Sequence, residues 1–276
     1  MNKIGFIGYG SMGSVLIHGF LSSEALKPEE MIVSSRTKDK LMPLTQKWPD
    51  IRVTDDNHFT AENSRTLFMC VKPLDVLPIL EDVGGHLTED THLVSIAACV
   101  TIGDLETLFH GKITKVVPSL VSDVKEGISL VCHNGLVDAE SAEKIESLLQ
   151  SISKTVRIDE NEFEVAADFT SCGPGMIAAI FRNFVEAGLK HSRLSRESAQ
   201  EMVIATLLGT ARLLLEKGMG FSELISGVAT KGGITEEAVK VLDNHLPGIF
   251  DEVFRKTVGK HNAVKKMVRN QRTSKG

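Results

Sequence analysis

The sequence lacks an excess of charge of one sign and lacks long apolar runs. Its 276 residues include 31 lysines and arginines against 36 aspartates and glutamates, a formal net charge of −5. It therefore has no global basic field to hold nucleic acid or an anionic membrane surface. No run reaches the roughly 18 apolar residues of a membrane span, and no signal-peptide pattern precedes the first predicted strand. These absences favour a cytoplasmic protein that binds small molecules.

Cysteines are few, and the patterns of common catalytic centres are missing. Cys70, Cys99, Cys132 and Cys172 are far apart without C-x-x-C spacing, which argues against a disulfide framework and favours a reducing compartment. The nine histidines show no metal-ligand spacing, so we expect no metal site. No H-E-x-x-H motif, paired carboxylates or catalytic triad is recognisable. The chemistry of the chain must therefore need none of these groups.

Short apolar runs alternate with helical or polar segments in the first half of the chain. These runs cover residues 3–7, 31–33, 66–71, 91–96 and 115–117. Strands alternating with helices predict an α/β fold with a doubly wound parallel sheet. Beyond residue 159 only helical periodicity remains, and 276 residues suffice for two domains. We predict a first domain over residues 1–158 and an all-helical second domain over residues 159–276.

A glycine pattern lies between the first apolar run and a stretch with helical spacing. It is Gly8-Tyr9-Gly10-Ser11-Met12-Gly13, which in this context is typical of a dinucleotide-binding loop. Gly8 permits a tight turn, Gly10 lets the backbone approach a pyrophosphate, and Gly13 permits close packing of helix against strand. The helix N-terminus offers N–H groups to phosphate. A turn without ligand is the alternative, but the context favours a Rossmann domain.

The end of the second predicted strand indicates which nicotinamide cofactor is bound. An NAD site has an acidic residue there for the ribose 2′-hydroxyl, whereas this segment is Ser34-Ser35-Arg36-Thr37-Lys38. Ser35 and Arg36 supply a hydroxyl and a guanidinium that can hold a 2′-phosphate. We predict that NADP(H) is preferred, with NAD(H) as the alternative if Arg36 and Lys38 are only solvated surface charges.

The second half contains a helix whose two ends are marked in the sequence. Ser195 is the predicted N-cap, and Gly218 stops the helix after Lys217. Between Met202 and Leu215 the helix is apolar nearly all round, which is typical of burial on several sides. The remaining helical residues are too few to surround it. We therefore expect two copies to interlock as a homodimer or a higher homo-oligomer.

The last stretch, residues 256–275, is basic. Its cations include Lys260, Lys265, Lys266, Arg269 and Arg272. We interpret it as a solvated helix end with a disordered tail, and nucleic acid as a partner is the less favoured alternative.

Six segments, in order over nearly the whole chain, form a more specific pattern. They are the Gly8 loop, Cys70-Val71-Lys72-Pro73, residues 95–102, Val117-Pro118, Gly173-Pro174 and Gly232-Gly233-Ile234-Thr235. This set resembles the pyrroline-5-carboxylate reductase family, whose members make proline. The resemblance implies an N-terminal Rossmann domain, a helical C-terminal dimerisation domain and an active site between them that reduces a small imino acid.

The resemblance also implies which residues contact cofactor and substrate. Asn57, Val71, Lys72 and Pro73 would lie beside the adenosine half of the cofactor, and Ala97 beside its nicotinamide end. Two segments would hold the substrate: Ser171, Cys172, Gly173 and Pro174 in the first, and Lys231, Gly232, Gly233 and Thr235 in the second.

Imine reduction requires few ionisable side chains. It needs a hydride donor held against the C=N carbon, a protonated or hydrogen-bonded nitrogen, and an anchor for the substrate carboxylate. Thr235 begins a predicted helix, so the N–H groups of Gly232, Gly233 and Thr235 can cradle that carboxylate. The Thr235 hydroxyl either caps the helix or bonds the substrate nitrogen, and the resemblance favours the second, catalytic role.

Both substrate segments depart from the usual family sequence. Cys172 replaces a serine, and Lys231 and Glu236 place new charges beside the proposed carboxylate site. Cys172 precedes a helix start that would lower its thiol pKa, so it is either a pocket wall or, less favoured, a nucleophile or redox sensor. The departures are typical of a divergent paralogue, similar to the reductase-like protein encoded beside competence genes in some Gram-positive bacteria.

Three functions stay open from the sequence. The favoured one is NADPH-dependent reduction of 1-pyrroline-5-carboxylate to L-proline. The second is a related imine or oxo-acid reductase with an altered substrate. The third is a non-catalytic protein that binds NADP(H) and regulates a partner.

Overall fold

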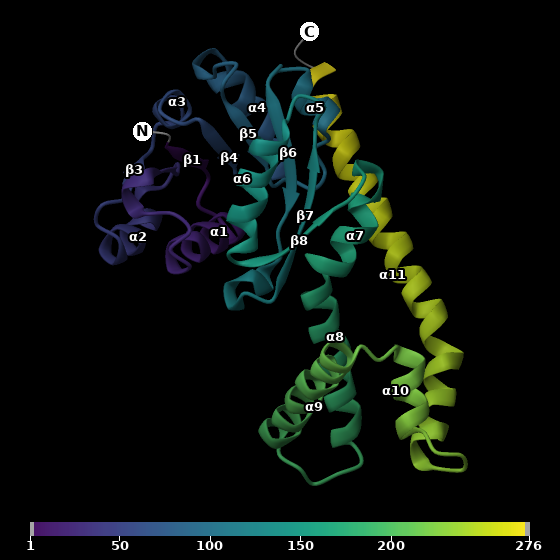
Figure 1. The fold of residues 1–276 in the computed structure, drawn as a ribbon. Coiled ribbons are helices and arrows are strands. Elements are labelled where there is room, and N and C mark those ends of the chain that lie inside the picture. Colours follow the sequence, from purple (N-terminus) through teal and green to yellow (C-terminus); the bar gives the residue numbers. More distant parts are fainter. Residues whose placement is uncertain (1–2, 274–276) are drawn as a thin grey trace. The chain divides into compact units, whose positions relative to one another are not determined.

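The computed structural model describes residues 3–273 and contains an eight-stranded sheet (Figure 1). The strands lie in the order β3 (Arg52–Thr54), β2 (Met31–Ser34), β1 (Ile4–Ile7), β4 (Thr66–Met69), β5 (His92–Ser95), β6 (Lys112–Val117), β7 (Gly127–His133) and β8 (Ser153–Arg157). All neighbours pair in parallel except β6 and β7, which are antiparallel. The predicted α/β fold is confirmed, although the sequence did not predict β3, β7 or β8.

Helices cover both faces of this sheet. One face packs against α1 (Ser11–Ser22), α2 (Met42–Lys47) and α6 (Ala139–Gln150). The other packs against α3 (Asn57–Glu62), α4 (Pro73–Val83) and α5 (Ile102–Glu106). Single 3₁₀ turns occur at η1 (Pro28–Glu30), η2 (Lys38–Leu41), η3 (Gly84–His86), η4 (Leu120–Val124) and η5 (Glu160–Glu162). The layering leaves the strand ends open, which is where doubly wound sheets bind ligands.

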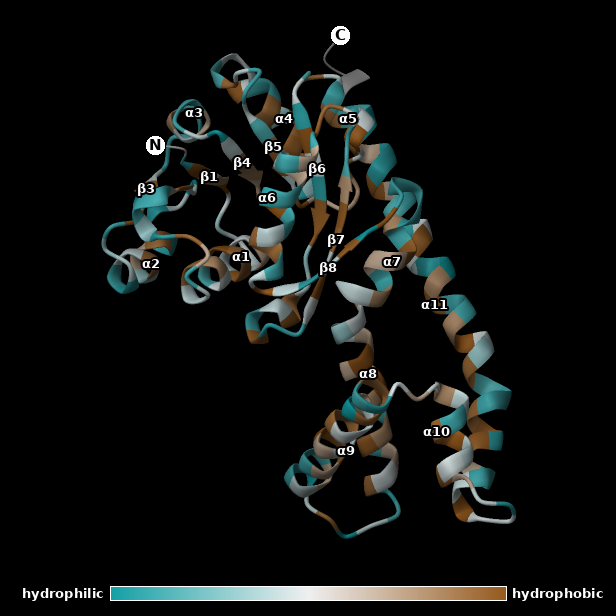
Figure 2. Cartoon of the chain, viewed as in Figure 1, coloured by the Kyte–Doolittle hydropathy of each residue, from teal (hydrophilic) through white to brown (hydrophobic). Residues whose placement is uncertain are grey.

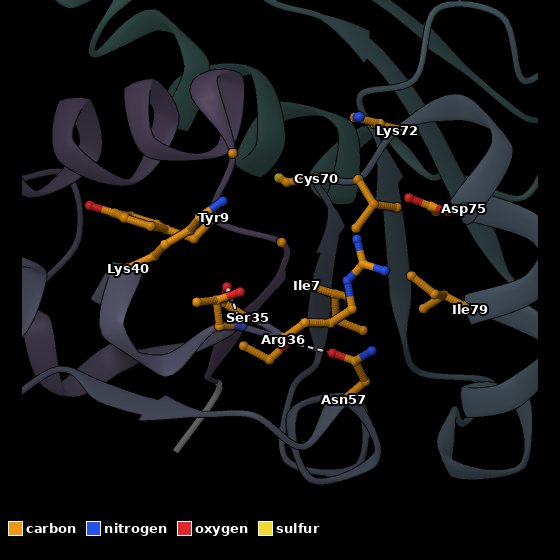
Figure 3. Close-up of a pocket in the computed structure, with 15 residues that line it drawn as sticks. Ile7, Tyr9, Ser35, Arg36, Lys40, Asn57, Cys70, Lys72, Asp75 and Ile79 are labelled. Carbon is orange, nitrogen blue, oxygen red and sulfur yellow. Dashed lines mark hydrogen bonds between the residues drawn. The ribbon is translucent and has the colours of Figure 1, made fainter. Parts of the chain in front are cut away.

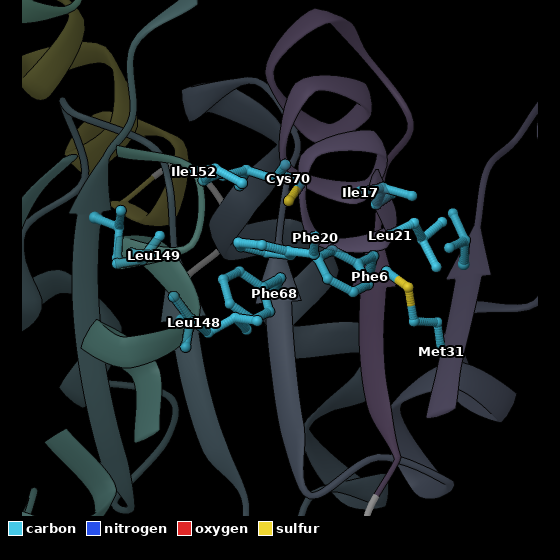
Figure 4. Packing of buried hydrophobic residues seen from close by; sticks show 14 of the residues in the cluster. Phe6, Ile17, Phe20, Leu21, Met31, Phe68, Cys70, Leu148, Leu149 and Ile152 are labelled. Atoms are coloured by element: carbon cyan, nitrogen blue, oxygen red, sulfur yellow. The ribbon is translucent and has the colours of Figure 1, made fainter. Parts of the chain in front are cut away.

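Three phenylalanines anchor α1 to the middle of the sheet (Figure 4). Phe6 in β1 and Phe68 in β4 stack with ring centroids 4.8 Å apart, and the Phe20 ring of α1 lies 6.0 Å from that of Phe68. All three side chains are fully buried. Each stabilises the fold by about 2 kcal/mol through its buried apolar area. The loop between β1 and α1 is thereby held at both ends by the core.

The chain divides into two compact units. The first runs to Pro174 and resumes at Thr257, and the second is Gly175–Lys256. The first includes α7 (Phe163–Thr170) and the end of α11 (Ile234–Thr273). The second contains most of α8 (Gly173–Leu189), α9 (Arg196–Lys217), α10 (Phe221–Val228) and the beginning of α11. The domain boundary placed after residue 158 stays a prediction.

Helix α9 has the ends that the sequence predicted but not the burial. The Ser195 Oγ accepts a hydrogen bond from the Ser198 N–H at 3.1 Å, and Gly218 ends the helix with φ +63°. No residue of α9 is buried within the described chain; Ile204 is 65% and Leu215 81% exposed. Apolar residues therefore line its open surface (Figure 2). Burial on several sides is wrong for the single chain and would require a second copy.

The basic end of the chain is helical up to Thr273 and is docked against the first unit. Arg269 Nε donates to the Asp104 carboxylate at 3.2 Å, Lys265 pairs with Glu164, and Val268 is fully buried. The predicted solvated helix end is thus wrong for Lys265 and Val268, whereas Lys260, Lys266 and Arg269 are exposed as expected. Lys275 lies outside the described residues. No helix within residues 3–273 combines the length and apolar character needed to cross a bilayer.

Candidate cofactor and substrate sites

The glycines of the β1–α1 loop differ in the space around them. A Cβ on Gly8, whose φ is +106°, would lie 2.4 Å from the Cys70 carbonyl oxygen. A Cβ on Gly13 would lie 2.6 Å from the Gly8 carbonyl oxygen, whereas one on Gly10 would meet nothing within 4 Å. Gly8 and Gly13 are therefore required by close packing, while Gly10 borders open space that a ligand can enter.

The N-terminus of α1 is suited to an anion. Gly10 is its N-cap residue, so no side chain caps it, and its first turn has no acidic residue. The first N–H groups of a helix have no partner within the helix and carry a partial positive charge. They are available to a phosphate group that approaches along Gly10.

A cavity of about 210 Å³ opens at the carboxyl ends of β1, β2 and β4 (Figure 3). This is the point where the strand order reverses beside β1, at which doubly wound sheets bind nucleotides. Its lining comprises Ile7, Gly8, Tyr9, Gly10, Ser34, Ser35, Arg36, Thr37, Lys40, Asn57, Cys70, Val71, Lys72, Asp75 and Ile79. The lining contains three cationic side chains and one carboxylate, so it favours an anionic ligand.

The predicted cofactor residues fall into two groups. Those that line the cavity are Gly8, Tyr9, Gly10, Ser35, Arg36, Asn57, Val71 and Lys72. Those outside the lining are Ser11, Met12, Gly13, Pro73 and Ala97. The first three of these form the first turn of α1, Pro73 begins α4, and Ala97 is buried in the loop after β5.

Hydroxyls and cations gather at the β2 end of the cavity. The Ser34 hydroxyl donates to Asn57 Oδ1 at 2.7 Å, the dashed line in Figure 3. Arg36 and Lys40 both line the cavity. Lys38, by contrast, pairs with Asp55 at 2.9 Å. The second cation at this end is therefore Lys40, which the sequence analysis missed.

Two missed lining residues could have been found from secondary structure. Lys40 lies in η2, one turn after the strand-end segment, so it returns to the same side as Arg36. Asp75 lies in the first turn of α4, two residues after Pro73. Neither residue matches the glycine motif, which is why a search by motif passed over them.

Tyr9 contributes to the cavity through its backbone and ring. Its hydroxyl oxygen lies 2.7 Å from His18 Nε2, and Figure 3 shows the hydroxyl directed away from Arg36 and Asn57. Burial raises the pKa of Tyr9 and is the main cause that lowers the pKa of His18. Both groups are therefore neutral near pH 7. Their contact holds the Tyr9 ring in place at the side of the cavity.

The first predicted substrate segment, residues 171–174, links α7 to α8. The Ser171 and Cys172 N–H groups both donate to the Ala167 carbonyl, at 2.8 and 2.9 Å, while Gly173 and Pro174 begin α8. Burial, followed by the nearby Asp168 carboxylate, raises the pKa of the Cys172 thiol. The lowering expected from the helix start is therefore wrong, and a reactive thiolate is disfavoured.

A buried carboxylate beside this segment was not predicted. Asp168 Oδ2 accepts a hydrogen bond from the Thr257 hydroxyl at 2.5 Å, and Asp168 Oδ1 lies 3.3 Å from His261 Nε2. His261 Nδ1 in turn lies 3.4 Å from Cys99 Sγ. Because Thr257 and His261 are far from Asp168 in the sequence, no local sequence pattern indicates this cluster. It joins the end of α11 to α7 and to the loop that follows β5.

The second predicted substrate segment, residues 231–235, lies in the second compact unit. Gly232 has φ +73°, and its N–H donates to Glu236 Oε2 at 2.7 Å. The Gly233 N–H donates to the Thr230 carbonyl at 2.8 Å. Helix α11 begins at Ile234, so half-buried Thr235 is its second residue rather than the residue before it. The exposed side chain of Lys231 lies in the same loop.

The fold and the cavity together define a Rossmann-type dinucleotide-binding protein. A model described as NADP oxidoreductase, coenzyme F420-dependent, matches residues 3–99. A model described as pyrroline-5-carboxylate reductase dimerisation matches residues 160–264. The two matches cover both halves of the chain.

Proteins similar to this chain match it over nearly its full length. The chain is 37% identical to "Pyrroline-5-carboxylate reductase 3" of Bacillus subtilis (strain 168), over 98% of this chain and 100% of that protein. It is 32% identical to "ComE operon protein 4" of the same organism, over 96% and 98%. The crystal structure of the Plasmodium falciparum pyrroline carboxylate reductase with NADP bound has the same fold, with a TM-score of 0.83, 24% identity and coverage of 97% and 98%. The chain belongs to the pyrroline-5-carboxylate reductase family.

Proposed function

We propose that this chain catalyses the NADPH-dependent reduction of 1-pyrroline-5-carboxylate to L-proline. The observation that carries the proposal is 37% identity to a pyrroline-5-carboxylate reductase along the entire length of both chains. A relationship over both halves supports more than a shared cofactor fold, because substrate residues come from loops outside the Rossmann motif.

The cavity supports NADP(H) as cofactor, with NAD(H) as the weaker alternative. The open side of Gly10 and the N-terminus of α1 would receive the pyrophosphate. Ser35, Arg36 and Lys40 would hold a 2′-phosphate through charge-assisted hydrogen bonds. The bound nicotinamide supplies the hydride that the imine carbon accepts. NADPH is favoured because cations outnumber carboxylates in the cavity lining.

At the substrate, Thr235 is the proposed catalytic residue. Its hydroxyl would donate a hydrogen bond to the imine nitrogen, which makes the C=N carbon more electrophilic and assists protonation of the product amine. Residues 171–174 are the proposed wall of the substrate pocket. The N–H groups of Gly232, Gly233 and Thr235, with Lys231 beside them, are the proposed contact of the substrate carboxylate. Because each group acts by position rather than by titration, the reaction needs no metal or nucleophile.

We further propose that the working molecule is a homodimer or a larger homo-oligomer. The match to a dimerisation model over residues 160–264 supports this assembly. So do the apolar side chains that a single chain leaves in solvent, among them Phe184 at 66% and Phe221 at 75% exposed. A soluble protein rarely leaves so many large apolar groups uncovered.

The test is NADPH oxidation by the purified chain with 1-pyrroline-5-carboxylate, beside an NADPH titration of the same sample. We expect saturable turnover. Thr235→Ala should lower kcat/KM roughly 100-fold without changing NADPH affinity, because only the hydrogen bond to the substrate is lost. Thr235→Ser keeps the hydroxyl and should retain most of the activity.

Other outcomes would favour other functions. Tight NADPH binding with turnover of a different imine or an oxo acid would indicate an altered substrate. Tight binding without any turnover would indicate a regulatory protein that senses NADP(H). Loss of NADPH affinity in Thr235→Ala, with turnover unchanged, would contradict the catalytic role.

A further inference from the structure

The backbone of the loop before α11 has a conformation that favours glycine at two positions. A Cβ on Gly233 would lie 2.7 Å from Thr230 Oγ1 and 2.8 Å from the Thr230 carbonyl oxygen, so only glycine fits there. Gly232 has a left-handed φ of +73°, which also favours glycine. The turn closes through the hydrogen bond from the Gly233 N–H to the Thr230 carbonyl at 2.8 Å. One of the three amides proposed to receive the substrate carboxylate is therefore already satisfied by the turn itself.

A second amide of the three is bonded by a carboxylate of the same chain. Glu236 Oε2 accepts from the Gly232 N–H at 2.7 Å, and 33% of the Glu236 side chain is exposed. A glutamate in the first helical turn that reaches back to an earlier amide stabilises the helix start, much as in a capping box. The contact also places the Glu236 carboxylate on the Gly232 N–H, which is one of the groups proposed to bind the substrate carboxylate.

Glu236 shares a lysine with the neighbouring Glu237. Lys240 Nζ lies 3.8 Å from Glu236 Oε2 but 2.7 Å from Glu237 Oε1, so the lysine is shared and pairs more closely with Glu237. Two carboxylates cannot accept from the one Gly232 N–H without close repulsion. A substrate carboxylate would thus have to displace Glu236, whereas a ring imine without a carboxylate would not.

We propose that Glu236 is a specificity-determining residue. Its carboxylate competes with the substrate carboxylate for the Gly232 N–H, and it therefore disfavours imines that carry a carboxylate relative to ring imines that lack one. The inference rests on the proposed function of this loop and narrows it. It predicts that the chain reduces 1-pyrroline-5-carboxylate with a KM raised by its own glutamate.

The experiment compares the wild type with Glu236→Ala and Glu236→Gln, using 1-pyrroline-5-carboxylate and 1-pyrroline as substrates. The ratio of kcat/KM for the first substrate over the second should rise about tenfold in Glu236→Ala, mainly through KM. It should rise less in Glu236→Gln, whose amide oxygen carries no charge but can still accept from the Gly232 N–H. Glu237→Ala is the matched control, since it removes an adjacent charge that does not bond the loop, and its ratio should stay within about twofold of the wild type. The KM for NADPH should not move in any variant.

Calorimetric titration of L-proline in the presence of NADP⁺ decides the point independently of turnover. Proline should bind about tenfold more tightly to Glu236→Ala than to the wild type, because the Gly232 amide is free. Equal proline affinity in the two proteins, including no binding to either, would overturn the proposal. An unchanged substrate ratio in folded Glu236→Ala would also overturn it. Failure of the wild type to reduce either imine would count against the proposed function, while the proline titration would still decide the role of Glu236.

Discussion

Arg36 and Lys38 lie two positions apart, but the structure gives them different surroundings. Arg36 lines the cavity, while Lys38 is paired with Asp55 at 2.9 Å. An ion pair that is already formed leaves less of the lysine charge for a ligand. Under the proposed function, the cation at this strand end that would face a 2′-phosphate is therefore Arg36, with Lys40 one turn later.

Replacing Arg36 by alanine should weaken NADPH binding about 10- to 100-fold, because a charge-assisted hydrogen bond to the 2′-phosphate is lost. NADH lacks that phosphate, and its affinity should change less than about twofold. Fluorescence titration of both cofactors measures the difference. Lys38→Ala is the matched control and should change neither affinity by more than about twofold. Equal losses of NADPH and NADH affinity in Arg36→Ala would remove the assignment.

Sequence alone could predict the residues of the cofactor site that follow a motif. Of the eight predicted residues that line the cavity, Gly8, Tyr9, Gly10, Ser35 and Arg36 follow from the glycine loop and the strand end, which are local patterns with fixed geometry. The family resemblance supplied the other three, Asn57, Val71 and Lys72. Lys40 was missed because its approach depends on η2, and the pairing of Lys38 with Asp55 could not be seen in the strand-end segment, because Asp55 follows β3. The partners that neutralise a charge are tertiary facts, so no local window contains them.

How well each helix or strand could be predicted from the sequence depended on its boundary residues and, for strands, on its composition. The ends of α9 were predicted because Ser195 and Gly218 have strong capping preferences. The strands β3 and β8 were missed because one has three residues and the other, Ser153–Arg157, is mostly polar. They form by pairing with β2 and β7, and not through an apolar pattern of their own.

A chain of hydrogen bonds crosses three strands and ends on α6. His92 Nε2 lies 2.7 Å from Thr114 Oγ1, which lies 2.7 Å from His133 Nδ1, and His133 Nε2 lies 2.8 Å from Glu146 Oε1. Burial is the main cause that lowers the pKa of His92 to about 4, and electrostatic interactions with His133 and Lys112 add to it. This histidine is therefore neutral in the folded protein near pH 7.

The low pKa of His92 predicts a loss of stability in acid. The unfolded chain binds a proton at His92 below about pH 6.5, while the folded chain resists it down to about pH 4. Stability is thus fully present above pH 6.5 and falls as the pH drops towards 4, by up to about 3 kcal/mol. Urea unfolding between pH 7 and pH 4 measures this slope.

The matched controls for this prediction are two glutamine variants. His92→Gln should flatten the dependence of the unfolding free energy on pH, whatever it does to the absolute stability. Exposed His110→Gln should keep the slope of the wild type. If His92→Gln kept the same slope, the pH dependence would have to come from another group.

At the scale of the whole molecule, the second compact unit lacks an apolar core of its own. Every residue of α9 and α10 is at least partly exposed within one chain. The three clusters of buried apolar residues lie in the first unit. We therefore expect the second unit to bury its apolar side chains by association with another copy. The apolar pattern of α9 indicates that a partner is needed, but it does not indicate which residues of the two copies meet.

Introducing a charge on α9 should separate the copies. Leu208 is 54% exposed in one chain, and Leu208→Glu should shift the molar mass from oligomer towards monomer in light scattering, because a buried unpaired carboxylate is unfavourable. Leu136, which is 57% exposed in the first unit, provides the control. Leu136→Glu should leave the mass unchanged, and an unchanged mass in Leu208→Glu would place the interface elsewhere.

The final turns of α11 belong to the first compact unit, although they are the last part of it to be synthesised. Val268 is fully buried in the apolar cluster that includes residues of α4 and α5, and Arg269 bonds Asp104. On the ribosome, at roughly 5–20 residues per second, the sheet is made well before this helix emerges. The Rossmann unit must therefore wait with an apolar face uncovered while the second unit is translated. Chaperone binding to nascent chains should persist until Val268 has left the ribosome, since only then can that face close.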